Sequence, residues 1–347
     1  MIKRVALALT LLLAAVAVTL WWANSELERW MDQPLNIIAD TVIELQPGEN
    51  LTRLARRLEA EGIVSDARFF QWYLRVNDAG HSVHAGEYLL IPRMTPRDLL
   101  DALVTGRVIE YSITLPEGRT LRETLQTLHD DPRLEREISA EQLYEPQQWL
   151  GPEFDFPAAE GAFFPDTYRY HRGQSDADIL RRAWQAMRRV IDDEWAERAD
   201  GLPLNSPWEA IILASIIERE SGHVDERARI AGVFIRRLNK QMRLQTDPTV
   251  IYGLGDEFDG NLTRKHLRTP GPYNTYMNMG LPPTPIALPG RASIHAALHP
   301  SDDTALYFVA RGDGSHAFSA TLSEHRAAVR QYQLKRRKDY HSSPAKQ

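Results

Sequence analysis

The sequence contains no cysteine among its 347 residues. This absence excludes disulfides, thiolate metal sites, a cysteine nucleophile and a lipid-modified N-terminal cysteine. The chain also lacks a glycine-rich phosphate motif, a nucleophile elbow and the acidic spacing of a calcium loop, so we expect no cofactor. The formal net charge of −6 and the mostly dispersed basic residues argue against a nucleic-acid partner. A chain of this length suits two domains that each bury a core.

One long apolar run is present, over residues 5–23, directly after two basic residues. It has the roughly 20 residues that a spanning helix needs, and Trp21 and Trp22 stand at the expected interfacial position. The positive-inside rule places residues 1–4 in the cytoplasm and the rest of the chain across the membrane. A cleaved signal peptide is the alternative, because residues 15–17 resemble a cleavage site, but the apolar run continues beyond them. In a bacterium, this predicts a single-pass inner-membrane protein with a periplasmic body.

The rest of the chain is typical of an α+β protein in two parts. Residues 24–40 are expected to form a polar, helical juxtamembrane stalk. Residues 41–107 show a strand, two helices, a second strand and a capped third helix, which predicts a small α+β domain. Residues 108–342 are expected to form a larger mixed α+β domain, and residues 343–347 a tail. A weak repeat of strand, glycine turn and helix, at an offset of 70 residues, suggests that both domains open alike.

The most informative segment is a predicted helix from Ser206 to Gly222 that is almost wholly apolar until it reaches Glu218 and Glu220. Ser206 with Glu209 indicates a capping box, and Gly222 indicates a C-terminal cap. The helix dipole disfavours negative charge in the last turn, and burial does the same, so both should raise a carboxyl pKa. Cleavage of a glycosidic bond requires a general acid that stays protonated near neutral pH.

A plainer interpretation is that both glutamates are solvated at a frayed helix end and paired with Arg219 or a residue such as Arg227. Positions two apart on a helix point about 200° apart, so one of the two glutamates is expected to face a cleft. Glu218 shares a face with Ala214 and Ser215, which are small enough to leave room for a substrate beside it. On these packing grounds we favour Glu218 as the general acid and take Glu220 as the reserve candidate.

Three polar and aromatic clusters follow, at residues 245–252, 272–276 and 280–286, in loops rich in proline, tyrosine, asparagine and threonine. A rigid groove of this composition suits a saccharide, because sugar faces stack on aromatic rings and sugar hydroxyls take paired hydrogen bonds. The alternative is a set of irregular connections whose polar side chains bond their own backbone. Long loops inside compact domains are usually functional, so we favour the groove.

His295 and His299 lie four residues apart on a predicted helix, a spacing at which two histidines can share a metal ion. No His-Glu-x-x-His arrangement accompanies them, Pro300 ends the helix at once, and no thiolate exists to complete a site. We therefore predict no metal site.

Several short segments carry a resemblance to a known family. They are Pro47-Gly48-Glu49, Gly86–Leu90, Glu160–Tyr168, Ala214–Glu218, Asp247–Gly253, Pro272–Tyr276 and Gly280–Pro283. With the N-terminal span, they resemble the YceG-like endolytic murein transglycosylases (MltG proteins) over nearly the whole chain. The chain departs from the family's usual residues at Gly271, Thr284 and Leu288, where Ser, Gly and Asn are common. The family's substrate contacts at these three loop positions are therefore not expected in this chain.

The resemblance implies a LysM-like domain over residues 41–107 and a YceG-like catalytic domain over residues 108–342. It also implies that the catalytic glutamate is the first acidic residue after the Ala-Ser-Ile run, which is Glu218. Glu220 is the reserve candidate, partly because goose-type lytic enzymes use the glutamate of a Glu-Ser pair such as Glu220-Ser221.

The implied activity is that of a lytic transglycosylase, a carbon–oxygen lyase that cleaves the β-1,4 bond between N-acetylmuramic acid and N-acetylglucosamine in nascent, uncrosslinked peptidoglycan. Glu218 would protonate the bridging oxygen and then remove the proton from the C6 hydroxyl, which leaves a 1,6-anhydro end without consuming water. Assistance by the substrate's N-acetyl group would explain why no second catalytic carboxylate is needed. The candidates for holding sugars are Gln245, Tyr252, Tyr273, Asn274 and Tyr276, with Asp247 as a further polar anchor.

An anchor in the inner membrane would confine cleavage to new strands near their polymerase and so limit glycan length, with peptidoglycan synthases as the expected partners. Two alternatives remain open. An enzyme that uses water at the same site would be a muramidase with a reducing-end product. A noncatalytic peptidoglycan-binding scaffold of the cell-wall synthesis machinery would need no acid.

Overall fold

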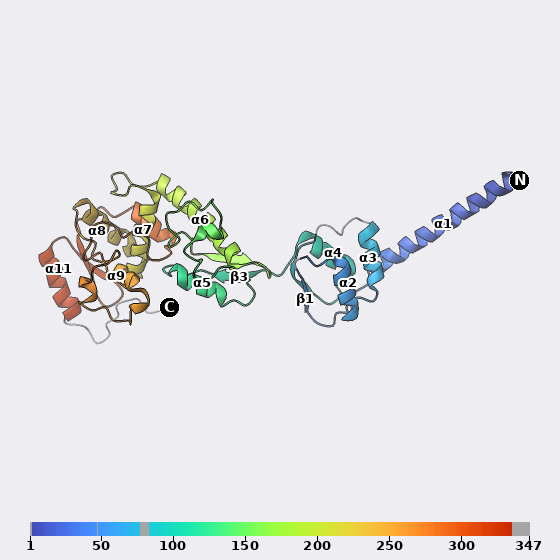
Figure 1. The fold of residues 1–347 in the computed structure, drawn as a ribbon, viewed down its shortest axis with the longest axis horizontal. Helices are drawn as coiled ribbons and strands as arrows, with labels where there is room; N and C mark the ends of the chain where they lie inside the picture. Colours follow the sequence, from blue (N-terminus) through green and yellow to red (C-terminus); the bar gives the residue numbers. More distant parts are fainter. Residues whose placement is uncertain (1, 47, 77–82, 335–347) are drawn as a thin grey trace. The chain divides into compact units, whose positions relative to one another are not determined.

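The computed structural model describes residues 2–46, 48–76 and 83–334. Pro47, the predicted tail over residues 343–347 and the end of the predicted catalytic domain lie outside the described residues. The chain divides into two compact units, Met1–Tyr111 with Arg169–Gln174, and Ser112–Tyr168 with Ser175–Gln347. Both units combine helices with short strands (Figure 1), which confirms the predicted α+β class.

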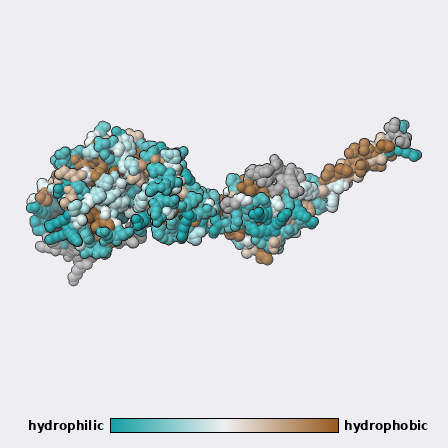
Figure 2. Space-filling view, in the orientation of Figure 1, coloured by the Kyte–Doolittle hydropathy of each residue, from teal (hydrophilic) through white to brown (hydrophobic). Residues whose placement is uncertain are grey.

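Helix α1 (Ile2–Met31) carries the apolar run. Its large apolar side chains from Val5 to Trp22 are exposed, and Figure 2 shows them as an apolar surface along the helix. Among the described residues, this is the one helix long and apolar enough to cross a membrane.

The last turns of α1 belong to the first unit. Leu27, Trp30 and Met31 are buried in its hydrophobic core, and Trp30 Nε1 donates to Ser65 Oγ at 2.9 Å. The three apolar residues follow the three- and four-residue spacing of one helix face, which explains why this end packs. This differs from the polar stalk expected over residues 24–40, because part of that segment is core.

The rest of the first unit is built around an antiparallel strand pair. The pair places Ile43 opposite Tyr88, and both side chains lie in the core with Leu54 and Leu58. The sequence predicted each of these elements: β1 (Thr41–Leu45), α2 (Leu51–Ala60), α3 (Ala67–Val76), β2 (Gly86–Leu90) and α4 (Pro96–Thr105).

The predicted repeat is present at the start of the second unit. The strand β3 (Tyr111–Thr114) leads through a glycine turn to α5 (Leu121–His129), as β1 leads to α2. The backbone φ is 76° at Gly48 and 75° at Gly118, in the left-handed region that glycine adopts readily. Each glycine turn therefore stands directly before a helix.

The second unit is organised around α7 (Pro207–Glu220), which packs against α6, α8, α9 and α10. Strand β3 pairs with β4, whose last two residues, Arg169 and Tyr170, count with the first unit, and β5 pairs antiparallel with β6. The other elements of this part of the chain are β4 (Thr167–Tyr170), α6 (Asp176–Ala196), α8 (Arg227–Asn239), α9 (Asp247–Leu254), α10 (Arg291–Leu298), β5 (Tyr307–Ala310), β6 (His316–Ser319), α11 (Leu322–Val329), the 3-10 helices Pro146–Gln148, Val224–Glu226, Gly255–Glu257 and His266–Arg268, and the π-helix Arg330–Leu334.

Helix α7 has the predicted apolar character but not quite the predicted ends. Every residue from Ala210 to Ile217 is buried, as expected of a helix that is apolar all round. Ser206 caps it by accepting from the Glu209 N–H, but the Glu209 carboxylate turns back to Asn205, so the capping box is half formed. The C-terminal cap is Ser221, one residue before the predicted glycine.

One predicted segment differs in the structure. The loop cluster expected over residues 245–252 contains helix α9. Pro248 stands in the first turn of α9, where a proline needs no hydrogen-bond donor. The buried Thr249 hydroxyl donates to the Thr246 carbonyl at 2.9 Å and strengthens this start. The segment thus forms a short helix although its composition is typical of a loop.

Candidate active site

A cavity of about 360 Å³ lies where helix α7 ends. Both glutamates that the sequence singled out, Glu218 and Glu220, line it. The other lining residues are Glu117, Gly118, Arg119, Arg219, Ser221, Gly222, Gly314 and His316. The cavity therefore brings together the end of α7, the turn before α5 and the start of β6.

Glu218 is an enclosed side chain with both carboxyl oxygens hydrogen-bonded, and it is only 5% exposed. Arg227 Nη2, at the start of α8, donates to Oε1 at 2.8 Å, and the Gly290 N–H, just before α10, donates to Oε2 at 3.0 Å. The arginine is a partner that the plainer interpretation named. That interpretation also predicted a solvated, frayed helix end, but the Glu218 side chain is enclosed.

The small residues Ala214 and Ser215 do not leave the open space predicted beside Glu218. Both are fully buried. Ser215 Oγ donates to the Ile212 carbonyl at 2.7 Å and accepts from the Ile286 N–H at 3.0 Å. The open space predicted beside Glu218 is therefore absent, because the chain around Ile286 fills that side of the helix.

Glu117 is a cavity carboxyl group that the sequence analysis missed. Its side chain is 47% exposed, and its Oε2 lies 3.6 Å from Arg227 Nη2. Burial and the neighbouring Glu218 carboxylate raise the pKa of Glu117, against the opposing effect of Arg227. Glu117 lies 101 positions before Glu218, so only the folded chain brings the two together.

Backbone contacts hold the turn of Glu117 against the segment before α10. The Gly118 N–H donates to the Leu288 carbonyl at 2.9 Å, and the Leu288 N–H donates to the Arg119 carbonyl at 2.8 Å. A Cβ at Gly290 would lie 1.9 Å from Glu117 Oε1. The absence of a side chain at Gly290 therefore makes room for this carboxyl group beside Glu218.

Glu220 shows the raised pKa that the sequence predicted for this helix end. Burial raises the pKa of Glu220 to about 7, and the charge of Asp247 adds to the effect, although a hydrogen bond from the Thr246 hydroxyl opposes it. A carboxyl group with this pKa carries a proton in much of the population near neutral pH. The reserve candidate thus has the protonation that a general acid needs.

The predicted sugar-holding residues are not among those that line this cavity. Tyr252 and Tyr273 meet edge to face at 4.9 Å, and Tyr273 Oη lies 2.7 Å from Thr284 Oγ1. Tyr276 Oη donates to Asp247 Oδ1 at 2.6 Å. These contacts form two separate groups of side chains: Tyr252, Tyr273 and Thr284 in one, and Tyr276 and Asp247 in the other.

Asn274 and Gln245 hold the same region in different ways. Asn274 is buried, and its side-chain amide donates to the Thr269 carbonyl at 2.7 Å. Gln245 is exposed at a φ of 51°, and its backbone N–H donates to the Thr275 carbonyl at 3.1 Å. The contact of all these loop residues with a sugar stays a prediction.

Glu160 is a second buried acid that the sequence analysis did not single out. It is 2% exposed and accepts from the Leu121 N–H at 2.9 Å and from Tyr252 Oη at 3.2 Å. Burial raises its pKa to about 7, although both hydrogen bonds oppose the shift. Glu160 therefore ties the start of α5 to the predicted groove residue Tyr252.

We expect Glu160→Gln to flatten the pH dependence of stability. The ordinary pKa of 4.5 applies in the unfolded chain, so between pH 4.5 and about 7 the folded protein holds a proton that the unfolded chain has lost. The free energy of unfolding therefore falls as the pH rises through this window, by up to about 3 kcal/mol. The glutamine oxygen can still accept from the Leu121 N–H, and its amide N–H can donate to the Tyr252 hydroxyl, so the variant keeps two hydrogen bonds and removes this titration.

The measurement is the urea midpoint of the detergent-solubilised protein across this pH window, with exposed Glu257→Gln as the control. Equal slopes for wild type and Glu160→Gln would contradict the assignment.

The fold and the site define a class, an α+β protein with a membrane-length N-terminal helix and a polar cavity that gathers three carboxyl groups. The model of the YceG-like family matches residues 43–331, and the chain therefore belongs to this family. The resemblance found in the sequence motifs is confirmed.

The chain is similar to the endolytic murein transglycosylase of Bacillus subtilis (strain 168), with 30% identity over 306 residues and 84% of each chain covered. A protein of the same name from Streptococcus pneumoniae serotype 2 (strain D39) is 26% identical over 300 residues. The match covers 77% of this chain and 54% of that longer relative. A crystal structure of a YceG-like protein from Listeria monocytogenes is 31% identical, with a TM-score of 0.51, 83% of this chain covered and 98% of that chain.

Proposed function

We propose that this protein is an endolytic murein transglycosylase, a lyase that cuts peptidoglycan strands and leaves 1,6-anhydro ends. The observation that carries the proposal is Glu218, an enclosed carboxyl group at the end of an apolar helix, in a cavity that also holds Glu117 and Glu220. The membership in the YceG-like family and the names of the relatives support the reaction type.

Glu218 acts first as the acid and then as the base. Its proton goes to the bridging oxygen as the bond from C1 to that oxygen breaks, and positive charge develops at C1. The Glu218 carboxylate then takes the proton from the C6 hydroxyl while that oxygen bonds to C1. The acid is regenerated, the leaving sugar keeps the first proton, and no water is consumed.

Arg227 allows Glu218 to alternate between the two protonation states. Arg227 Nη2 lies 2.8 Å from Glu218 Oε1 and 3.6 Å from Glu117 Oε2. When Glu218 holds a proton, Arg227 keeps Glu117 as a charged partner. When Glu218 loses it, Arg227 and the Gly290 N–H stabilise the new carboxylate. Glu117 is thus a positioning residue that offers Arg227 a second partner.

We expect Glu117→Gln to lower kcat about tenfold while KM changes little, which corresponds to about 1.4 kcal/mol in the barrier. Without a second carboxylate, Arg227 has Glu218 as its one close acidic partner in this cavity and cannot exchange it for another as the proton moves. Glu123→Gln, in the nearby first turn of α5, is the matched control. Steady-state cleavage of purified glycan strands gives both constants. An unchanged kcat in Glu117→Gln would remove Glu117 from the account.

The loop residues are proposed to hold the sugars on either side of the scissile bond. Tyr252 and Tyr273 offer ring faces and hydroxyls, and Tyr276, Asp247 and Gln245 offer polar groups. Asn274 contributes through the loop that its buried amide holds in place. Aromatic rings and fixed polar groups are what saccharide sites use.

Residues 41–107 are proposed as a LysM-like domain and residues 108–342 as the catalytic domain. The order β1, α2, α3, β2 with an antiparallel strand pair supports the first assignment. Helix α1 is proposed to anchor the protein in the inner membrane through residues 5–23, with residues 1–4 in the cytoplasm and the body in the periplasm. Peptidoglycan synthases are the proposed partners, since the substrate is the strand that they make.

The function is tested by digestion of purified uncrosslinked glycan followed by mass analysis of the new ends. A transglycosylase gives 1,6-anhydro ends, which are one water lighter than reducing ends. Reducing ends would identify a muramidase, and intact strands that remain bound to the protein would identify a noncatalytic scaffold.

A further inference from the structure

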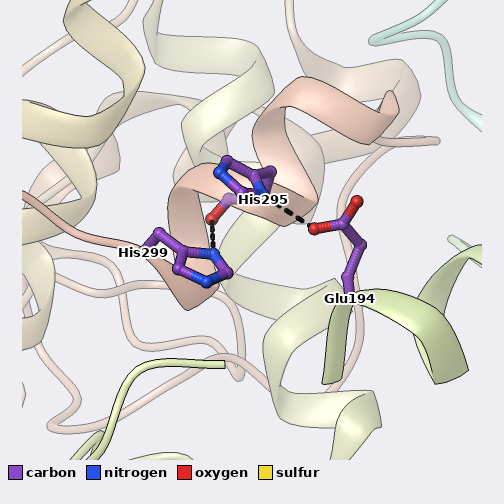
Figure 3. Close-up of side chains that lie close together, drawn as sticks. All are labelled: Glu194, His295 and His299. Carbon is purple, nitrogen blue, oxygen red and sulfur yellow. Dashed lines mark hydrogen bonds and ion pairs between the residues drawn. The ribbon is translucent and has the colours of Figure 1, made fainter. Parts of the chain in front are cut away.

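Glu194, His295 and His299 form a side-chain cluster at the C-terminal end of α10 (Figure 3). One ligand atom from each residue lies within 4.8 Å of those of the other two, and among the described residues this is the one such group of histidines and carboxylates. Glu194 comes from α6, some 100 residues before the two histidines, so the sequence could not reveal it as a third ligand. The cluster lies outside the proposed catalytic cavity.

The hydrogen bonds of the cluster prepare each side chain to bind a cation. Glu194 Oε1 accepts from Arg291 Nε at 2.7 Å, which leaves Oε2 facing His295 Nδ1 at 2.8 Å. Both oxygens of Glu194 thus face a nitrogen, the arrangement in which a carboxyl group acts as an acceptor.

Both ring nitrogens of His299 lie near carbonyl oxygens, but a neutral imidazole can donate a hydrogen bond from only one of them. Nε2 lies 2.9 Å from the Glu197 carbonyl, and Nδ1 lies 3.2 Å from the His295 carbonyl. A neutral imidazole has only one N–H, so it can donate to only one of the two oxygens. Donation to the nearer Glu197 carbonyl leaves the lone pair on Nδ1. Metal-binding histidines usually have this arrangement, with the second nitrogen donating to a carbonyl.

We propose that Glu194, His295 and His299 bind a zinc-class divalent cation. The ion takes the place of the proton between His295 Nδ1 and Glu194 Oε2, and this proton is released to solvent. Two imidazoles and one carboxylate suit zinc, and the exposed side of His295 leaves a fourth position for water. The Arg291 and Glu197 contacts orient two of the three ligands, as in established metal sites.

A bound ion would link the end of α6 to the end of α10. Helix α10 begins directly after Gly290, whose N–H bonds Glu218. His295 and His299 lie five and nine residues further along, about 7.5 and 13.5 Å away at the usual rise per residue. The ion therefore has no part in the proposed reaction. Its expected effect is to stabilise the second unit.

The test uses the full-length protein in detergent, stripped with a chelator and titrated with zinc chloride alone by calorimetry. We expect one zinc ion per chain, with a Kd near the micromolar range, and a higher melting temperature with zinc. His295→Gln and His299→Gln should each weaken binding at least tenfold and remove the thermal shift. Both side chains are partly exposed, so the metal-free melting temperature should stay near that of the wild type.

The matched control is His129→Gln, because His129 pairs with the buried Asp176 at 2.9 Å without a second histidine. It should bind zinc like the wild type. Equal zinc affinity in the wild type, His295→Gln and His299→Gln, or no binding by the wild type, would overturn the proposal. Both readouts are independent of glycan cleavage, so the proposal can fail while the proposed function stands.

Discussion

Glu218→Gln is expected to lower the rate of glycan cleavage by about 10²- to 10⁴-fold, the usual contribution of a general acid and base. Glutamine has nearly the same shape, and its single amide oxygen can accept from Arg227 or from the Gly290 N–H, but it carries no transferable acidic proton. Arg227 would lose its nearest charged partner, yet Glu117 remains 3.6 Å away. The fold should therefore survive while catalysis is lost. The measurement is the rate of appearance of new glycan ends, with a strand-binding assay on the same preparation.

Two variants sharpen this prediction. Glu209→Gln, at the opposite end of α7, controls for the loss of a carboxylate on this helix and should retain activity. Glu220→Gln tests the reserve candidate, whose pKa near 7 makes it the competing acid. A severe loss in Glu220→Gln together with an active Glu218→Gln protein would move the acid role to Glu220.

Gly161→Ala is expected to lower the free energy of unfolding by about 2–4 kcal/mol, the sum of backbone strain and overpacking. Gly161 has a φ of 81°, which an alanine adopts only with strain. A Cβ there would lie 2.4 Å from Cβ and Cγ of Pro285 and 3.3 Å from Ile211 Cγ2. Neither a proline ring nor a buried helix residue can move away easily, so the segment after Glu160 would separate from α7.

Gly151→Ala separates the two causes. Its φ is 91°, but no heavy atom lies within 4 Å of the added Cβ, so it should cost only the backbone strain of about 1–2 kcal/mol. The urea midpoints of both variants and the wild type give the comparison. Equal losses in the two alanine variants would show that the contact with Pro285 contributes nothing.

The sequence predicted the features that depend on residues close together in the chain. Apolar spacing and caps identified α2, α4 and α7, and the glycine turn revealed the repeat before α5. The position of two carboxyl groups at the end of α7 was also visible, because an apolar helix that ends in acids is unusual. These signals lie within about twenty residues of each other, and local physical rules decide them.

The sequence could not predict what distant segments bring together. Glu117, Glu160 and Glu194 each act beside a partner many positions away, and nothing in their own neighbourhoods indicates it. Ser215 was misjudged for the same reason, since the chain that fills its side of α7 comes 71 positions later. Helix α9 was missed because proline and threonine are typical of loops, and only its buried contacts make it helical.

The most direct test of the central claim is to cleave purified glycan in water labelled with heavy oxygen and to weigh the new ends. If the C6 hydroxyl of the substrate attacks C1, the new ends carry the 1,6-anhydro ring and no heavy oxygen. Reducing ends that have gained one heavy oxygen atom would show that water attacks instead, and would contradict the account.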